Sequence, residues 1–435
     1  MTRPATVFAM PTFVRIRALR VLVSSWLIAG AAHADPAKLD PAKLKAIDGI
    51  AAATLKKGHI PGIVVFAGAG NRVDFRGVYG NRRVLPTSEP MTADTLFDMA
   101  SCSKVVGTTA ALMCLVEDGK LSLDDPVAKY LPAFAANGKD RVRLRDLTTH
   151  TSGLPPYTSA EALRKKYGPG PNPDAVIETI CALPLQYKTG EKVVYACLNM
   201  ITAARVAETV AGESLHTFLT RRVYGPLGMT DTGYHPDAAQ LARVAPTTRD
   251  DDPSATNHEL GAGQSPAGAF LVGAAHDPLA HYGTNDAHCS GNAGVFTTAA
   301  DVSVFLRMIL NRGEFGGKRI YKPETVDLFT RVQTPKGIES RGFGWDVWND
   351  YPFEPKADLP EGEQAVGHTG YTGTLIWIDK HAGLWATILT NRVHPADTKE
   401  SGADVSHLRK EVIRTIVEAC DDYAPKPEAT PAAGR

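Results

Sequence analysis

The sequence predicts a globular protein of the α+β class, because strand signals lie near both ends of the chain and helical spacing dominates between them. The strand signals are apolar or alternating runs at 63–67, 72–79, 365–368, 375–378 and 384–390. The composition, 43% hydrophobic and 22% charged, is typical of a folded protein. A chain of 435 residues is too long for one small core, so we expect one large domain or two interleaved domains.

The helices are expected between these strands. The first, over 40–57, ends at Gly58 and Pro61, and the first two strand runs then form a hairpin around 68–71. A helix over 105–117 has apolar residues on several faces, which suits a buried position. Later elements are a helix from 143 running into a loop, helices over 200–210 and 298–310, a helix and loop over 215–232, a long irregular region over 247–292, a terminal helix over 406–420, and a disordered Pro/Ala-rich tail over 425–435.

The N-terminus resembles an export signal. An apolar run over 21–29 precedes Ala32-His33-Ala34, an A-x-A cleavage pattern, and basic residues come before it at Arg3, Arg15, Arg17 and Arg20. We therefore expect residues 1–34 to be removed and the protein to be periplasmic or secreted, without stable membrane insertion after cleavage. An uncleaved anchor is the second interpretation, although the apolar run is short for a membrane span.

Charge and cysteine content narrow the possible partners. Lys plus Arg and Asp plus Glu both number 47, so the net charge is zero and no basic run suggests a nucleic-acid partner. The six cysteines are scattered and show no C-x-x-C pattern, so single buried thiols are expected for most of them. We expect no cofactor, and a small-molecule or peptidoglycan-derived substrate is the only partner considered; the sequence does not indicate the oligomeric state.

Ser101 stands at the start of the apolar helix, in the stretch Ser101-Cys102-Ser103-Lys104. A serine there can be an N-cap, or it can be a nucleophile. Lys104 lies three residues on, so in a helix its amine shares a face with the Ser101 hydroxyl and can take its proton. The helix N-terminus would also favour a developing oxyanion.

Further stretches of the sequence support the interpretation of Ser101 as a nucleophile. Ser101-Cys102-Ser103-Lys104 is similar to an S-x-x-K motif, and 117–132, 144–155, Tyr195-Ala196-Cys197 and His368-Thr369-Gly370 follow in order. Together they resemble the serine β-lactamase and penicillin-binding-protein superfamily, in its class C-like branch, over residues 45–420. The resemblance implies a β-lactamase/transpeptidase-like fold over 35–424: an antiparallel sheet flanked by helices, from about 45–100 and 295–420, and a mostly helical part over about 105–295.

The resemblance also implies roles for the site residues. Ser101 would form an acyl-enzyme, and Tyr195 would act with Lys104 as a base whose pKa the ammonium lowers. Without the resemblance, Tyr195 would be taken as a core tyrosine. His368, Thr369 and Gly370 would lie on an edge strand, where the glycine lets substrate approach. The backbone N–H groups of Tyr371 and Ser101 would form the oxyanion hole.

Two positions depart from the family pattern. Cys197 stands where the family usually has Asn or Asp, and His368 replaces the lysine of the K-T-G form of the third motif. Both changes point away from efficient β-lactam turnover, because a polar contact and a permanent cation are lost.

Other histidines are expected to have structural roles. His150 is expected to hold the loop before Ser152 and Gly153. The stretches 276–280 and 291–296 resemble an H-D-x-x-A and G-x-A-G-x-F pattern that forms a cleft wall. A metal site from His276, Asp277, His281, Asp286 and His288 is not favoured, because their spacing matches no standard ligand set.

Two classes of function remain. The first is an exported serine hydrolase acting on an ester, amide or β-lactam carbonyl, with a peptidoglycan-related substrate among the options. The second is a catalytically weak penicillin-binding-like protein that binds cell-wall fragments. An α/β-hydrolase is discounted, because its G-x-S-x-G motif has only an incomplete counterpart at 263–267.

Overall fold

The computed structural model describes Met1 and residues 37–249, 269–349 and 364–421. The rest of the predicted signal peptide, the incomplete motif at 263–267 and the predicted tail at 425–435 lie outside the described residues. The described residues from 37 onward belong to one compact unit.

A seven-stranded antiparallel sheet confirms the predicted α+β class. The N-terminal hairpin and the C-terminal strands share this sheet, because β1 pairs with β11 in register from Ile63 opposite Thr390 to Ala69 opposite Leu384. In spatial order the strands are β3 (Glu89–Pro90), β2 (Phe75–Arg83), β1 (Gly62–Ala69), β11 (Leu384–Thr390), β10 (Leu375–Asp379), β9 (Gln364–Thr369) and β8 (Asp346–Asn349).

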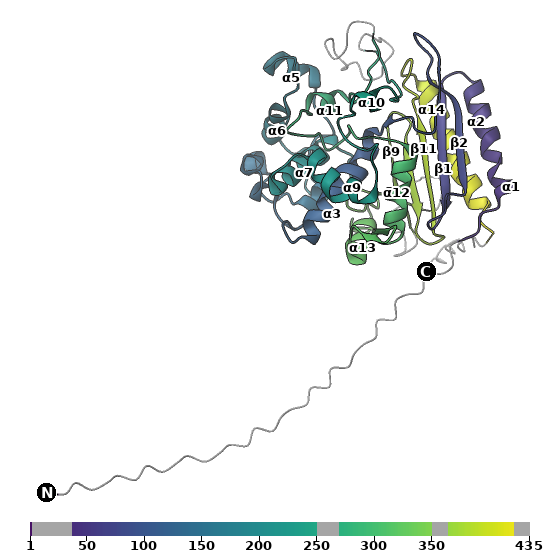
Figure 1. Cartoon of the computed structure of the whole chain (residues 1–435). Helices are drawn as coiled ribbons and strands as arrows, with labels where there is room; N and C mark the ends of the chain where they lie inside the picture. Colours follow the sequence, from purple (N-terminus) through teal and green to yellow (C-terminus); the bar gives the residue numbers. More distant parts are fainter. Residues whose placement is uncertain (2–36, 250–268, 350–363, 422–435) are drawn as a thin grey trace, which may run out of the picture. The chain divides into compact units, whose positions relative to one another are not determined.

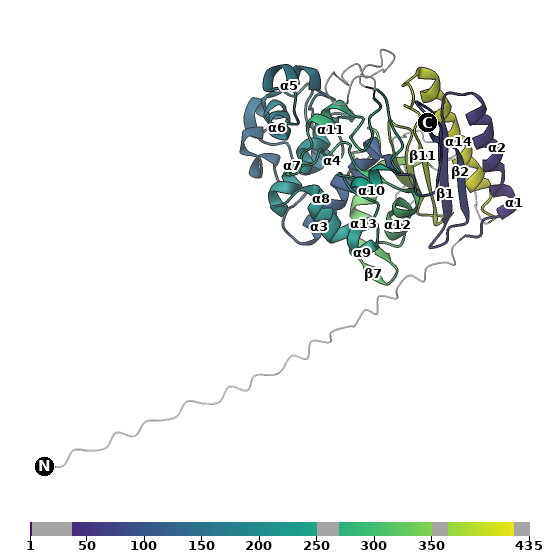
Figure 2. The ribbon, with the colours of Figure 1, turned by 45° about the horizontal axis from the view of Figure 1, so that its top comes forward.

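Helices cover both faces of the sheet (Figure 1). Alternate residues of β1 point to opposite sides, so Ile63 and Val65 join one apolar cluster and Val64 and Phe66 join another. The first cluster is closed by α1 (Pro41–Leu44), α2 (Ala46–Lys56) and α14 (Lys399–Glu418). The second continues through α12 (Ala299–Leu310) into a group of helices beyond it (Figure 2).

This group of helices comes mostly from the middle of the chain. Its members are α3 (Ala110–Glu117), α4 (Leu144–Thr148), α5 (Ala160–Tyr167), α6 (Pro173–Ala182), α7 (Cys197–Ala211), α8 (Leu215–Leu219), α9 (Gly225–Leu227), α10 (Ala238–Leu241), α11 (Pro278–Tyr282) and α13 (Pro323–Thr330). Short 3₁₀ segments lie at Val127–Lys129 and Pro132–Gly138, and a π-helical turn at Thr220–Tyr224 links α8 to α9. Two strand pairs, β4 (Phe97–Asp98) with β5 (Phe296–Thr297) and β6 (Glu314–Phe315) with β7 (Lys318–Arg319), complete the elements.

The predicted boundaries needed two corrections. The terminal helix begins at Lys399 rather than 406, because Thr398 caps it by accepting a hydrogen bond from the Ser401 N–H. The second strand of the hairpin runs over 75–83 rather than 72–79, and α5, α6, α13 and β8 were not predicted.

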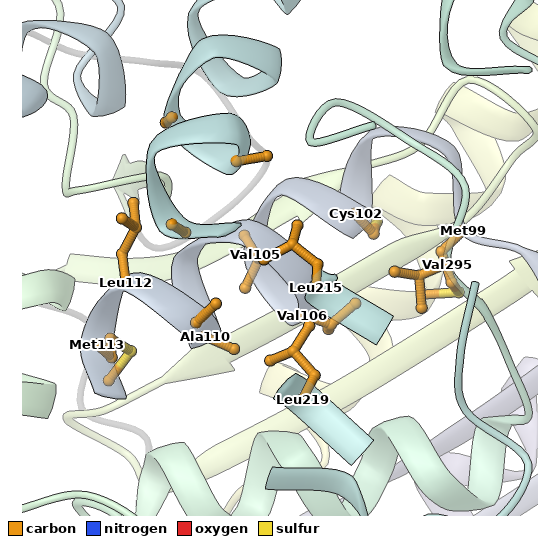
Figure 3. Packing of buried hydrophobic residues seen from close by; sticks show 14 of the residues in the cluster. Met99, Cys102, Val105, Val106, Ala110, Leu112, Met113, Leu215, Leu219 and Val295 are labelled. Atoms are coloured by element: carbon orange, nitrogen blue, oxygen red, sulfur yellow. The ribbon is translucent and has the colours of Figure 1, made fainter. Parts of the chain in front are cut away.

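The apolar helix after Ser101 is a core element. It consists of a π-helical segment, Lys104–Thr109, which continues into α3, and almost all of its side chains are buried. Figure 3 shows Val105, Val106 and Ala110 packed beside Leu215 and Leu219 of α8. The longer stretch Ala100–Glu117 is long and apolar enough by composition to span a membrane, but most of it is buried inside the protein. A firmly packed helix therefore supports the segment that carries Ser101.

Candidate active site

Ser101 lies in a 3₁₀ turn, Ala100–Cys102, between β4 and the π-helical segment. It is partly exposed, whereas Cys102, Ser103 and Lys104 beside it are buried. Ala100 has a positive φ of 45°, a conformation that costs free energy for a residue with a Cβ. This strained turn leaves Ser101 accessible, whereas the three residues that follow it are buried.

The carboxylate of Asp98 stabilises this turn. It accepts hydrogen bonds from the N–H of Ala100 at 2.8 Å and from the N–H of His276 at 2.7 Å. Burial raises the pKa of Asp98 to about 6, although both N–H groups act to lower it. Sequence reasoning missed this residue, and its signal was a carboxylate within the apolar stretch that leads to Ser101.

Asp98→Asn is expected to change how stability depends on pH. The folded pKa of Asp98 lies above its ordinary value of 3.8, so this group stabilises the fold below pH 4 and that contribution is lost as pH rises through 6. A pKa shift of about two units corresponds to a loss of about 3 kcal/mol in the free energy of unfolding. Denaturant unfolding at several pH values should show that the wild-type free energy of unfolding falls more steeply from pH 4 to 6 than that of Asp98→Asn.

Asp118→Asn is the control for this experiment. The hydrogen-bonded guanidinium of Arg222 lowers the pKa of Asp118, so Asp118 titrates below the pH window in question. Its replacement should leave the slope from pH 4 to 6 unchanged. If the free energy of unfolding fell equally steeply with pH in the wild type and in Asp98→Asn, burial would not raise the pKa of Asp98.

Lys104 is fully buried and fixed by three contacts. Its Nζ donates to Ser101 Oγ at 2.9 Å and to the carbonyl oxygen of Asn292 at 2.8 Å, and it lies 3.8 Å from Cys197 Sγ. A neutral amine could keep the contacts to Asn292 and Cys197 and turn its lone pair to the Ser101 hydroxyl. The geometry is therefore that of a nucleophile beside its base.

Tyr195 lies just before α7, with its ring 4.9 Å from Lys104 Nζ. Its hydroxyl is buried and makes no hydrogen bond to any described residue, yet Lys104 and Ser101 are close enough to lower its pKa. Burial has the larger effect and raises the pKa of Tyr195 above its ordinary value. Lys104 lowers this pKa as the resemblance implied, but burial outweighs it, so the resting phenol keeps its proton.

Cys197 is the first residue of α7, is partly exposed, and contacts Lys104 through its Sγ atom. Burial raises the pKa of its thiol, so the thiol is neutral near neutral pH. Burial also opposes the charged form of Lys104, but Cys197 and Tyr195 together raise the pKa of its ammonium above the ordinary value. Lys104, Tyr195 and Cys197 thus form one coupled group that holds its protons at neutral pH.

His150 supports Tyr195 from behind. Its ring centroid lies 4.8 Å from that of Tyr195, and its Nδ1 accepts a hydrogen bond from the N–H of Ala196 at 3.2 Å. Asn199 links His150 to Ser152, because its Nδ2 lies 3.3 Å from His150 Nδ1 and its Oδ1 accepts from the Ser152 hydroxyl. Burial keeps the pKa of His150 well below its ordinary value. His150 therefore acts through packing and a fixed neutral ring.

His368 lies behind Tyr195, 5.9 Å between ring centroids, and is only 2% exposed. Burial and the nearby Lys104 keep its pKa well below the ordinary value, and its Nδ1 bonds to the carbonyl oxygen of Thr369. The expected edge position is corrected in part. β9 is not the outermost strand, because β8 pairs with it from Gln364 to Gly367, but His368 and Thr369 lie beyond the last of these pairs. His368 is a buried neutral group.

Gly370 follows β9 and packs against the segment that leads to Ser101. A Cβ at Gly370 would lie 2.0 Å from Thr374 Oγ1 and 2.5 Å from the carbonyl oxygen of Met99. The close approach that demands glycine is therefore made by the protein's own chain, which corrects the expectation of substrate approach. Thr369 beside it is partly exposed.

Tyr371 is 41% exposed, and its hydroxyl donates to Asp397 at 2.7 Å. Arg392 lies over its ring at 4.4 Å and donates from Nε to the Tyr371 carbonyl oxygen. The Tyr371 ring also stacks on the ring of His276, with centroids 5.6 Å apart. These contacts fix the chain after Gly370 close to Ser101, and an oxyanion-hole role for the Tyr371 N–H stays a prediction.

The residues considered for a metal have other partners. Asp277 caps α11 and accepts a hydrogen bond from Tyr157, and His288 Nδ1 lies 2.8 Å from Glu208 Oε2. No group of three or more His, Cys, Asp or Glu side chains in the described residues is arranged to hold a metal ion. The stretch 291–296 contributes more than a wall, since the Asn292 carbonyl holds Lys104.

Known proteins share this arrangement of the chain. The family model described as Beta-lactamase matches residues 47–409. An "N-acetylmuramyl-L-alanine amidase" of Bacillus subtilis (strain 168) is 31% identical over 382 residues, covering 83% of this chain and 84% of that protein. A protein of Escherichia coli (strain K12) described as "Putative D-alanyl-D-alanine carboxypeptidase" is 30% identical over 346 residues, covering 74% and 76%.

A solved structure gives the same fold. "EstCE1, a hydrolase with promiscuous acyltransferase activity" matches with a TM-score of 0.65 at 23% identity, over 88% of this chain and 99% of the other. The S-x-x-K stretch, the sheet and these matches lead to one conclusion: the chain belongs to the β-lactamase and penicillin-binding-protein superfamily of serine hydrolases, in its class C-like branch.

Proposed function

We propose that this protein is an exported serine hydrolase that forms an acyl-enzyme at Ser101 on an ester or amide carbonyl. The observation that carries the proposal is the hydrogen bond between Ser101 Oγ, which is partly exposed, and Lys104 Nζ, which is fully buried. A surface lysine would be solvated and would gain little from such a contact. A buried one, fixed by the Asn292 carbonyl, is oriented for proton transfer.

The residues suggest the order of events. Ser101 Oγ attacks the substrate carbonyl carbon while its proton passes to the unit formed by Lys104 and Tyr195. The carbonyl oxygen becomes an oxyanion, held by the N–H groups of Ser101 and Tyr371. The tetrahedral intermediate collapses, and the same unit returns a proton to the leaving group. Water then attacks the acyl carbon and gives a proton to the same unit, and Ser101 Oγ leaves and takes a proton back from it.

Neutral groups around the nucleophile influence which substrates the site would accept. His368 and Cys197 supply no cation for a substrate carboxylate. The Arg341 guanidinium, 5.6 Å from the Tyr195 ring, is engaged with Glu339 and Asp346. This surrounding favours small esters, or peptidoglycan-derived amides held by other contacts, over β-lactams. The names of the matched amidase and carboxypeptidase agree with a cell-wall substrate.

A comparison of substrates tests the proposal. The full chain is expressed in a bacterial host, and the mass of the exported product is expected to correspond to cleavage before Asp35. We expect labelling by a fluorophosphonate, clear hydrolysis of short-chain p-nitrophenyl esters and weak hydrolysis of a chromogenic cephalosporin. A wide preference for the cephalosporin would contradict this view of the pocket. Slow labelling by fluorescent penicillin with no turnover of either substrate would favour the alternative, a catalytically weak penicillin-binding-like protein.

A further inference from the structure

Arg409 is a buried arginine on α14, on the side of the sheet away from the helical group. Arg409 is only 9% exposed, and among the described residues no Asp or Glu carboxylate lies within ion-pair distance of its guanidinium. Burying a guanidinium without a counterion costs free energy unless strong hydrogen bonds replace its water. Burial lowers the pKa of Arg409 to about 10, which leaves it charged at neutral pH.

Arg409 donates two hydrogen bonds to the turn that joins β9 to β10. Its Nη2 donates to the carbonyl oxygens of Gly370 and Thr374, each at 2.7 Å. Gly370 and Thr374 are also joined directly, because the Gly370 N–H donates to the Thr374 carbonyl at 2.7 Å. The cation therefore sits where the two ends of the turn meet.

The Gly370 carbonyl shares one planar peptide group with the N–H of Tyr371. A guanidinium bonded to the carbonyl oxygen fixes the plane of this peptide. It also draws electron density toward the oxygen, which makes the N–H a stronger donor, as in any chain of linked hydrogen bonds. Arg409 thus acts on the Tyr371 N–H without touching it.

The turn is held to the segment that carries Ser101. Thr374 Oγ1 donates to the Met99 carbonyl at 2.9 Å, and Thr372 Oγ1 donates to the Asp98 carbonyl at 2.7 Å. Gly370 itself packs so closely on Met99 that a Cβ would clash. The orientation that Arg409 gives to the Gly370–Tyr371 peptide is therefore defined relative to Ser101.

We propose that Arg409 is a positioning residue for the oxyanion hole, which orients and polarises the Gly370–Tyr371 peptide so that its N–H stabilises the anion formed when Ser101 attacks. This inference rests on the proposed acyl-enzyme at Ser101. When Ser101 Oγ bonds to the carbonyl carbon, its proton passes to the unit of Lys104 and Tyr195, and the π electron pair moves to the carbonyl oxygen. The Tyr371 N–H donates a hydrogen bond to that oxyanion. The positive charge of Arg409, one peptide away, favours the same state.

The carbonyl stretching frequency of the acyl-enzyme tests this role, because it falls as the hydrogen bonds to the acyl oxygen strengthen. The acyl-enzyme is formed from a ¹³C-carbonyl-labelled p-nitrophenyl ester, trapped by acidification and measured by infrared difference spectroscopy. We expect Arg409→Met to raise this frequency and to lower kcat about tenfold to hundredfold with little change in KM, a smaller loss than removal of a whole oxyanion donor. Arg409→Lys keeps a cation and should give intermediate values.

Ile413→Ala is the matched control, because Ile413 is a fully buried residue of the same helix in the sheet-facing cluster. It should lower stability without moving the stretching frequency. If Arg409→Met, or Arg409→Lys where the methionine variant does not fold, keeps the wild-type frequency and kcat, Arg409 only supports the turn and the proposal is overturned. Absence of fluorophosphonate labelling in the wild-type protein would instead refute the acyl-enzyme itself.

Discussion

Ser101→Ala is expected to abolish acylation and to lower turnover by about 10⁵-fold or more, as the loss of a nucleophilic serine does in other hydrolases. Ser101 is partly exposed, and its hydroxyl accepts a hydrogen bond from Lys104. Its removal should therefore cost little stability. The measurements are fluorophosphonate labelling, ester turnover and thermal unfolding of the variant and the wild type.

Ser103→Ala provides the control, since Ser103 is the other serine next to Lys104. Its side chain is fully buried, and its Oγ accepts a hydrogen bond from the Val295 N–H at 3.0 Å. Removing this acceptor should cost about 1 kcal/mol of stability, while labelling and kcat stay close to the wild type. If Ser101→Ala were still labelled, or if Ser103→Ala lost its labelling, the assignment of Ser101 as the nucleophile would be wrong.

Local patterns explain why much of the fold could be predicted. The run Gly62–Ala69 is apolar throughout and is buried on both faces of the sheet, as continuous apolar strands usually are. The helix after Ser101 is apolar on all sides for the same reason. The start of α14 was missed because its first turns are polar, and the signal there was the capping residue Thr398.

The site was predictable in its residues and not in its electrostatics. The spacing of Ser101 and Lys104 predicts their hydrogen bond, and the family resemblance brought in Tyr195 and His368. The depth at which each side chain lies depends on contacts between residues far apart in the chain. Burial keeps Tyr195 protonated, although the resemblance implied a base with a lowered pKa, and it holds the pKa of His368 well below its ordinary value.

Arg409 illustrates the same limit. It interrupts the apolar face of α14, between Leu408 and Val412, and such a cation within an apolar stripe was the available signal. Its partners at Gly370 and Thr374 lie more than thirty residues away, and only the folded sheet brings them together.

Lys104→Met and Tyr195→Phe are each expected to lower kcat/KM by about 10³-fold, the size of a lost general base. Tyr195→Phe is a clean probe, because the hydroxyl it removes makes no hydrogen bond to the described residues. Lys104→Met removes the contacts to Ser101 and Asn292 together. The double variant should have a kcat/KM only slightly below that of the less active single variant, since the effects of groups that act as one unit are not additive. Additive losses would show that the two residues have independent roles.

The pH profile then separates the two members of this unit. Attack by Ser101 needs the unit to have lost one proton, and the pKa values of Lys104 and Tyr195 both lie above their ordinary values. The active fraction therefore grows as pH rises, so kcat/KM for an uncharged ester should increase from neutral to alkaline pH. His368, whose pKa lies well below its ordinary value, should add no rise in mild acid. Tyr195→Phe removes a group that raises the pKa of Lys104, so the residual activity should rise at lower pH than in the wild type. A midpoint that stays in place or moves upward would mean that Tyr195 does not share its proton with Lys104.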